Sequence, residues 1–292
     1  MRSKILKGYT FAIISAVIYG CMPLMATHIY ADGVNPMTLV FLRNCLALPA
    51  LAILAFTQQK TLKVPAKSLF STTILSFFGC VITPILLFSS YQHMASSTAT
   101  IFHFAYPAIV VIAGILFLKK KMQIGNLISV FLCIVGISLF YNPSEPISFT
   151  GAAFALSSAI TLATYVVLLS QTEQKVSGFL FTFYIALAAS IMTFIACILT
   201  DNLALPSSLF GWGLCLLFAI SVTVGAVVLF QQATFLIGGE KTSILSTLEP
   251  ITSVVIGILI LNEKANPTVY IGSALVVTAS FLIAISDIKK EK

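Results

Sequence analysis

The stretch KTSILSTLEPITSVVIGILILNEKA, residues 241–265, decides the fold because it occurs twice in the chain. The earlier copy, residues 98–122, reads TATIFHFAYPAIVVIAGILFLKKKM, and at a constant offset of 143 residues eight of the 25 positions are identical. Each copy is apolar and contains an interior proline with an ionisable or phenolic residue directly before it. An internal repeat decides the architecture. The chain is therefore predicted to consist of two halves with one plan, 1–144 and 145–292.

The composition excludes a water-soluble protein. Of the 292 residues 59% are hydrophobic and only 9% are charged, whereas soluble domains contain about 25% charged residues. The net charge of +7 would suit a nucleic-acid partner in a polar chain, but here the basic residues lie in short connections and at the termini, so none is expected. None of the six cysteines has CxxC spacing, so neither a disulfide nor a metal site is expected.

Apolar segments long enough to cross a bilayer, about 20 residues each, follow one another along the whole chain. Short connections that contain Gly, Pro and Asn separate them, and no stretch is long enough for a soluble domain. The sequence therefore predicts an all-α polytopic membrane protein with ten transmembrane helices. The predicted segments are 8–30, 36–57, 68–91, 96–118, 123–141, 149–170, 178–200, 208–237, 241–262 and 267–286.

The basic residues set the predicted orientation, since cytoplasmic connections carry an excess of Lys and Arg. With the N-terminus inside, 14 of the 16 basic residues fall on the inner side, whereas Lys264 falls outside and Arg43 within a segment. We expect an integral protein of the bacterial inner (plasma) membrane with both termini in the cytoplasm. The inner residues are Arg2, Lys4, Lys7, Lys60, Lys63, Lys67, Lys119, Lys120, Lys121, Lys175, Lys241, Lys289, Lys290 and Lys292.

Stripes of small residues extend the repeat to the first and sixth segments. Such a stripe on one helix face lets a neighbouring backbone approach closely. Segments one to five thus correspond to segments six to ten, and because five is odd the second unit enters the membrane with opposite orientation. Inverted repeats of this kind occur in secondary transporters, with a central site at the repeat interface. The stripes are Gly8, Ala12, Ala16 and Gly20, and then Gly151, Ala155, Ala159 and Ala163.

The run LEPITSVVIGILILNEKANPTVYIGSALVV, residues 248–277, resembles the end of an EamA-type repeat. That pattern has a proline often preceded by Glu, a glycine seven residues on, a terminal Glu, and Ile-Gly opening the last helix. Here these are Glu249, Pro250, Gly257, Glu263, Ile271 and Gly272. The resemblance covers nearly the whole chain and implies the drug/metabolite transporter superfamily, a ten-helix bundle that moves small solutes by alternating access. The first half has Tyr106 and Lys120 in place of the two glutamates, so the halves are chemically unequal.

Two ionisable residues lie inside apolar segments. Glu249 is eight residues into the ninth segment, about 12 Å deep at 1.5 Å per residue. Because burial disfavours a charged carboxyl group, it suits a proton carrier; the alternative is a neutral acid bonded to a carbonyl that a proline frees. Arg43, about 10 Å from an outer end, is a partner for Glu249, a clamp for a substrate carboxylate, or a side chain that snorkels to the interface.

Repeat equivalence selects further cavity residues. His103 and Tyr106 share one face of the fourth segment, and their repeat mates Ser246 and Glu249 share the equivalent face of the ninth. Both faces are expected to line a central cavity where substrate binds. Structural hydrogen bonds are the alternative role of the His and Tyr side chains.

Tyr165, two-thirds along the sixth segment, is another candidate for this cavity, with interhelical packing as its alternative. For Gln231 and Gln232 in the eighth segment, an interfacial or interhelical role is expected. Pro107 and Pro250 are paired by the repeat and are expected to bend gating helices.

These features favour a secondary transporter, specifically an exporter of small organic metabolites, amino-acid-like solutes in particular. A channel or scramblase and a membrane-embedded enzyme are the alternatives. The chain has no GxxxxGK[ST] or HExxH motif and no carboxylate cluster, so it is expected to be no enzyme and to need no cofactor. A channel needs a continuous polar lining, which segments this apolar do not obviously supply. The expected partners are a small-molecule substrate, the bilayer and protons, for a monomer or homodimer.

Overall fold

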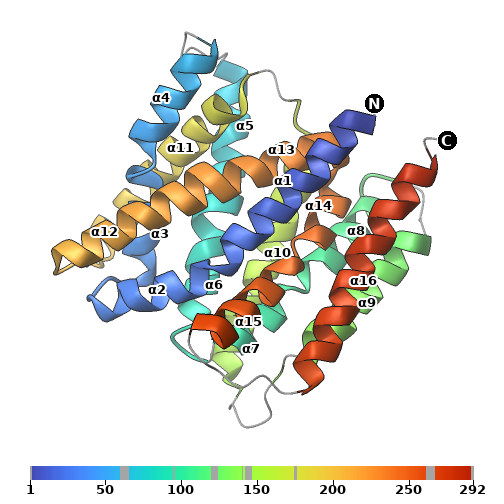
Figure 1. Cartoon of the computed structure of the whole chain (residues 1–292). Helices are drawn as coiled ribbons and strands as arrows, with labels where there is room; N and C mark the ends of the chain where they lie inside the picture. The colour runs from blue at the N-terminus through green and yellow to red at the C-terminus, as the bar shows by residue number, and fades with distance from the viewer. Residues whose placement is uncertain are drawn as a thin grey trace.

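The computed structural model describes residues 2–59, 66–94, 96–119, 124–139, 141, 147–173, 176–260 and 267–290, and these residues form helices and no strand (Figure 1). The first half contains α1 (Arg2–Gly20), α2 (Met22–Ala31), α3 (Pro36–Cys45), α4 (Leu48–Gln59), α5 (Ala66–Ser76), the π-helix η1 (Phe77–Ile82), α6 (Thr83–Ser90), α7 (Ser96–His103), α8 (Tyr106–Leu116) and α9 (Ile124–Ser138). The second half contains α10 (Phe149–Ser170), α11 (Gly178–Leu199), α12 (Leu209–Phe218), the π-helix η2 (Ala219–Val227), α13 (Val228–Ile237), α14 (Gly239–Leu245), α15 (Leu248–Ile260) and α16 (Pro267–Lys290).

In the described part of the chain, seven helical stretches are long and apolar enough to cross a membrane. Two shorter apolar helices cover Ile124–Ser138 and Tyr270–Leu282. All-helical architecture is confirmed, and every predicted segment contains helix, but the count of ten crossings stays a prediction. The seven stretches are Ser3–Ala31, Pro36–Gln59, Leu69–Ser90, Thr98–Leu116, Phe149–Ser170, Gly178–Leu199 and Leu209–Ile237.

Some residues used in the sequence analysis lie outside the described residues. They are Lys60, Lys63, Lys120, Lys121, Lys175, Glu263, Lys264 and Lys292.

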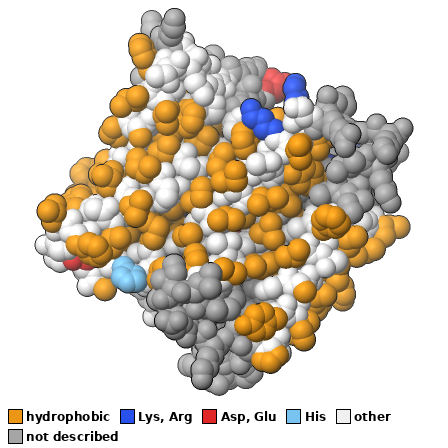
Figure 2. All heavy atoms as spheres, viewed as in Figure 1, with side chains coloured by type: hydrophobic (Ala, Val, Ile, Leu, Met, Phe, Trp, Pro, Cys, Tyr) orange, Lys and Arg blue, Asp and Glu red, His pale blue; other side chains and the backbone are white. Residues whose placement is uncertain are grey.

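The outside of the bundle is apolar. Large side chains such as Phe149 and Leu209 are 88% and 89% exposed. Figure 2 shows hydrophobic side chains spread over the visible face, with the coloured charged groups near its edges. Polar residues such as Asn44 and Gln231 are instead buried inside. Such an exterior is unfavourable in water and fits a bilayer, which solvates apolar side chains.

The two halves pack across each other rather than side by side. Helix α1 contacts α13, η2 and α15 of the second half, and α10 contacts α6, η1, α7 and α8 of the first half. The last helices of the halves, α9 and α16, also lie against each other (Figure 1). In this view the start of α1 and the end of α16 lie toward the same end of the bundle.

The small-residue stripes lie at close helix contacts, as the sequence predicts. Ala12 of α1 and Ala155 of α10 are both fully buried. A Cβ atom added at Gly8 would lie 2.5 Å from the Ile237 side chain, and one at Gly20 would lie 2.7 Å from the Glu249 carbonyl oxygen. The absence of larger side chains therefore lets α1 approach α13 and α15.

We expect Ala12→Leu and Ala155→Leu to lower the yield of folded protein, because a leucine at either position wedges apart close backbones. The measurement is the monodisperse fraction after detergent extraction and size-exclusion chromatography. Ala153→Leu, at an exposed position of the same helix as Ala155, is the matched control. Equal yields for Ala155→Leu and Ala153→Leu would show that the stripe does not determine packing.

The two prolines of the repeat lie in the first turns of helices. Helix α7 ends at His103, and α8 starts with Tyr106 and Pro107. In the equivalent place α14 ends at Leu245, and α15 starts three residues later with Pro250 in its first turn. A first-turn proline loses no helical hydrogen bond, because its missing N–H would have had no partner. Each of these predicted segments is thus a pair of helices with the break just before its proline, and the gating bend expected of the two prolines stays a prediction.

The π-helices are also related by the repeat. Phe77, the first residue of η1, and Ala219, the first residue of η2, are 142 residues apart, the offset that also relates Phe88 to Phe230. Single π-helical turns often occur at functional sites, because the wider turn redirects side chains. Both π-helices adjoin the pocket described below.

The connection after α2 is fixed to the start of α12. The Asp32 carboxylate accepts hydrogen bonds from the Ser208 amide at 3.1 Å and the Ser207 hydroxyl at 3.0 Å. The Ser208 hydroxyl in turn accepts from the Gly211 amide at 2.9 Å. Hydrogen bonds from Ser208, followed by those from Ser207, hold the pKa of Asp32 below its ordinary value.

Because the folded-state pKa of Asp32 is lowered, its stabilising contribution is present above the ordinary carboxyl pKa of about 4. It is lost as the pH falls through the folded-state value. We expect Asp32→Asn to lower the unfolding temperature at neutral pH, and the difference from wild type to disappear under acidic conditions. Asp201→Asn, at an exposed turn, is the control; a pH-independent difference for Asp32→Asn would contradict the assignment.

Candidate functional site

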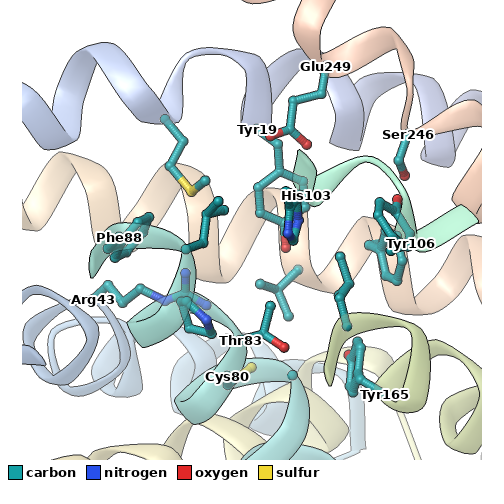
Figure 3. Close-up of a pocket in the computed structure, with 17 residues that line it drawn as sticks. Tyr19, Arg43, Cys80, Thr83, Phe88, His103, Tyr106, Tyr165, Ser246 and Glu249 are labelled. Carbon is teal, nitrogen blue, oxygen red and sulfur yellow. The ribbon is translucent and has the colours of Figure 1, made fainter. Parts of the chain in front are cut away.

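A pocket lies where the two halves meet (Figure 3). Both apolar and polar side chains from the two halves line this pocket. Its lining residues are Tyr19, Met22, Arg43, Gly79, Cys80, Thr83, Pro84, Leu87, Phe88, His103, Tyr106, Leu162, Tyr165, Val227, Phe230, Ser246 and Glu249.

The structure brings together every polar residue that the sequence selected. The six are Arg43, His103, Tyr106, Tyr165, Ser246 and Glu249. Pro107 and Pro250 do not line this pocket, but each directly follows a lining residue. Both prolines thus fix helix starts beside the pocket, while their gating role stays a prediction.

Repeat-related positions line the pocket together. Seven pairings of lining residues have the repeat separation of 143 or 142 residues. The two members of most pairs differ in chemistry, so one half presents groups that the other lacks. The pairs are Tyr19 with Leu162, Met22 with Tyr165, Pro84 with Val227, Leu87 and Phe88 each with Phe230, His103 with Ser246, and Tyr106 with Glu249.

Glu249 supplies the acidic group of the pocket. It lies in the first turn of α15, where its amide donates to the Ser246 carbonyl at 3.0 Å. Its side chain points from α15 into the pocket (Figure 3). Within the described part of the chain its carboxylate has no hydrogen-bond or ion-pair partner, so it is available to a proton or a solute.

Arg43 supplies the basic group, from α3 on another wall. Its side chain is 4% exposed, lies against the Cys80 thiol and leaves Nε without a hydrogen-bond partner. Arg43 therefore stays in the pocket wall and does not extend to the helix end. Arg43 and Glu249 form no ion pair among the described residues; Tyr19 lies within electrostatic range of both (Figure 3).

The side chain of His103 contacts the Ser158 hydroxyl group. The Ser158 hydroxyl donates to the Ala155 carbonyl at 2.6 Å and lies 2.7 Å from His103 Nδ1. If the single proton of the Ser158 hydroxyl is directed to that carbonyl, Nδ1 of His103 is the donor in this contact. A neutral His103 ring then keeps the acceptor Nε2 for other partners.

Tyr106 completes the polar lining on the same side. Its ring centroid lies 5.6 Å from that of His103, and its hydroxyl donates to the Ser243 carbonyl at 3.3 Å. This long hydrogen bond crosses from the first half to α14 of the second half. Tyr106 thus joins a pocket wall to the helix that precedes Glu249.

Tyr165 is fixed at both ends of its side chain. A Cβ atom added at Gly79 of η1 would lie 2.5 Å from the Tyr165 ring, so only glycine fits there. On the far side the ring stacks on Phe230 at 6.4 Å, and its hydroxyl accepts from Gln231 Nε2 at 3.0 Å. The π-helix and α13 together set the position of this pocket wall.

We expect Gly79→Ala to displace Tyr165 and to lower the free energy of unfolding by about 1–3 kcal/mol, the usual range for overpacking. Gly213→Ala is the control, since nothing lies within 4 Å of a Cβ there. Thermal unfolding of both variants measures the effect. An unfolding temperature for Gly79→Ala equal to that of Gly213→Ala would show that the ring contact is not tight.

Several lining residues were missed by the sequence analysis. Tyr19 and Met22 could have been found from the repeat, because they are the mates of lining residues Leu162 and Tyr165. Gly79 and Cys80 carried no comparable signal, since the π-helix that turns them into the pocket has no recognised sequence pattern.

Comparisons with known proteins agree with this architecture. The model of the EamA-like transporter family matches residues 6–142 and 149–285. The uncharacterized inner membrane transporter YicL of Salmonella typhimurium is 23% identical over 98% of both chains. An uncharacterized transporter of Haemophilus influenzae is 28% identical over an aligned region that covers 49% of this chain and 46% of that relative. A solved crystal structure with 16% identity superposes over the whole of both chains with a TM-score of 0.78, and so shares the fold.

Proposed function

The chain belongs to the EamA-like transporter family, and we propose that it is a secondary transporter that exports small organic solutes, amino-acid-like molecules in particular, across the bacterial inner membrane by alternating access. The observation that carries this proposal is the pocket between the halves. It has one acid, Glu249, whose carboxylate pairs with no described residue, and one buried base, Arg43, on a different wall. The similarity to YicL, which is named an inner membrane transporter, supports the inner membrane as the location.

The proposed architecture is ten crossing helices in two inverted repeats, 1–144 and 145–292. Its support is threefold: the family model matches the chain twice, α1 and α10 pack on equivalent helices of the opposite half, and seven repeat-related pairings of residues line the pocket. Inverted repeats place the substrate site at their interface near the membrane midplane. Alternating access would then rock one five-helix unit against the other around the pocket.

The charges suggest the class of solute. A zwitterion carries a carboxylate, which a guanidinium binds well, and an ammonium group, which a carboxylate binds. Arg43 and Glu249 offer these two partners from separate walls of the pocket. The phenol groups and the imidazole between them provide further hydrogen bonds. An amino-acid-like solute therefore matches the lining better than an uncharged sugar.

The proposed coupling ion is the proton, carried by Glu249. A ligand shifts a conformational equilibrium only if it binds the two states differently. A carboxyl group that is ionised when open to water and neutral when enclosed supplies that difference. Glu249 has the required freedom, because no described residue pairs with its carboxylate. Protons and solute would therefore act on the same rocking motion.

We expect Glu249→Gln to abolish transport driven by a pH gradient while solute binding or exchange survives, since the amide keeps the shape and removes the charge. Tyr106→Phe and His103→Ala should weaken binding instead. The assay is uptake into proteoliposomes with and without an imposed pH gradient. Glu173→Gln, in the connection after α10, is the control. An unchanged pH profile for Glu249→Gln would rule out the proton role.

We also expect reporter fusions to place both termini in the cytoplasm. This orientation follows from the excess of basic residues in the predicted inner connections. The start of α1 and the end of α16 lie toward the same end of the bundle, in agreement with this orientation (Figure 1). An external C-terminus would contradict both the even number of crossings and the inverted repeat.

A further inference from the structure

A buried hydrogen-bond chain runs from the pocket wall into the second half. It starts at Tyr165 of α10, continues to Gln231 of α13 at 3.0 Å and ends at Thr182 of α11, whose hydroxyl lies 2.6 Å from Gln231 Oε1. Gln231 and Thr182 are both 0% exposed, and of the three only Tyr165 lines the pocket. The chain therefore connects the solute site to side chains that the solute cannot touch.

Counting protons gives the chain a direction. An amide NH₂ group can only donate and an amide oxygen can only accept. Gln231 Nε2 faces Tyr165, so the Tyr165 oxygen accepts from Gln231. Gln231 Oε1 faces Thr182, so the Thr182 hydroxyl donates to it. The Tyr165 proton is consequently not used by Gln231 and remains free for a partner in the pocket.

The hydrogen bonds could also run in the opposite direction with every donor and acceptor satisfied. The Thr182 hydroxyl lies 3.0 Å from the Gly178 carbonyl oxygen and could donate there. A Gln231 amide turned by half a rotation would then donate to Thr182 and accept from Tyr165. In that arrangement the Tyr165 proton is consumed, and the pocket wall presents only an acceptor. The orientation of one buried amide thus decides which polarity the wall has.

We propose that Gln231 is a positioning residue that, through the orientation of its amide, makes Tyr165 a hydrogen-bond donor to the solute. This inference rests on the proposed function of the pocket. It assigns to the Tyr165 wall an acceptor oxygen of the solute, such as that of a carboxylate, carbonyl or hydroxyl group.

The surrounding residues hold the Tyr165 hydroxyl next to the Gln231 amide. Gly79 lies close against the Tyr165 ring, and Phe230 stacks on that ring. The short contact between Thr182 and Gln231 fixes the far end of the amide. Hydrogen bonds that only held the helices together would form in either orientation of the Gln231 amide. Tyr165 can donate to a solute only in the orientation in which Gln231 Nε2 faces Tyr165.

The first test needs no solute. The phenol C–O stretching band in ultraviolet resonance Raman spectra distinguishes a hydroxyl that accepts a hydrogen bond from one that donates. Subtraction of the Tyr165→Phe spectrum from that of wild type isolates this tyrosine. We expect an acceptor signature in wild type that is lost in Gln231→Met and weakened in Thr182→Val, but retained in the neighbouring control Gln232→Met. A donor signature to Gln231 in wild type would overturn the proposal.

The second test is a double-mutant cycle on binding, with each proteinogenic L-amino acid as a separate probe in thermal-shift titrations. We expect Gln231→Met to weaken binding of the stabilising amino acids about three- to tenfold, as for one neutral hydrogen bond. The same change in the Tyr165→Phe background should have no further effect, because Gln231 acts through that hydroxyl. Equal losses in both backgrounds would show a merely structural role.

The two proposals fail in different ways. If no amino acid stabilises the wild-type protein, the proposed solute class is wrong, and the Raman signature alone decides the role of Gln231. If Gln231→Met does not fold, Thr182→Val carries the same comparison, because it removes the hydroxyl that orients the amide while keeping the side-chain shape.

Discussion

Inside a bilayer the backbone has no water to bond, and this constraint places the functional site. Unsatisfied N–H and C=O groups are so costly in hydrocarbon that irregular backbone is tolerated only within protein or beside a water-filled cavity. The chain interrupts its helices between α7 and α8 and between α14 and α15, and widens two others into η1 and η2. Most of these irregular stretches contribute lining residues to one pocket. The irregular backbone and the pocket are therefore one feature.

The same low-polarity surroundings make the two ionisable groups of the pocket, Arg43 and Glu249, important for its function. Burying a charge without a partner costs free energy, and ionisable residues within membrane segments therefore usually have a function. Arg43 and Glu249 occupy one pocket without pairing, with Tyr19 in electrostatic range of both. A direct ion pair would have satisfied both groups permanently. Their separation leaves each able to gain a partner from a solute or a proton, which couples ligand occupancy to the stability of a particular conformation.

Much of the site could be predicted because the repeat converts sequence positions into spatial ones. The constant offset relates Tyr106 to Glu249 and His103 to Ser246, and all four residues line the pocket. Hydropathy alone located the helices, since only apolar helices suit lipid. It could not show that Pro107 and Pro250 begin new helices, because a proline is tolerated both at a kink and in a first turn. An interhelical role for Gln231 was among the sequence-based expectations, but its partners Tyr165 and Thr182 could not be predicted, because they depend on distances between three helices.

The central claim is that the pocket between the halves carries a solute across the membrane as a carrier site, and counterflow in proteoliposomes tests it most directly. Vesicles that contain the purified protein are loaded with an unlabelled amino acid and diluted into buffer with a trace of the radiolabelled form. A carrier with one alternating site must accumulate label transiently above equilibrium, because each outward trip of unlabelled solute returns the site to bind label. The account predicts this overshoot for wild type. Label that only rises to equilibrium would indicate a channel and contradict the account.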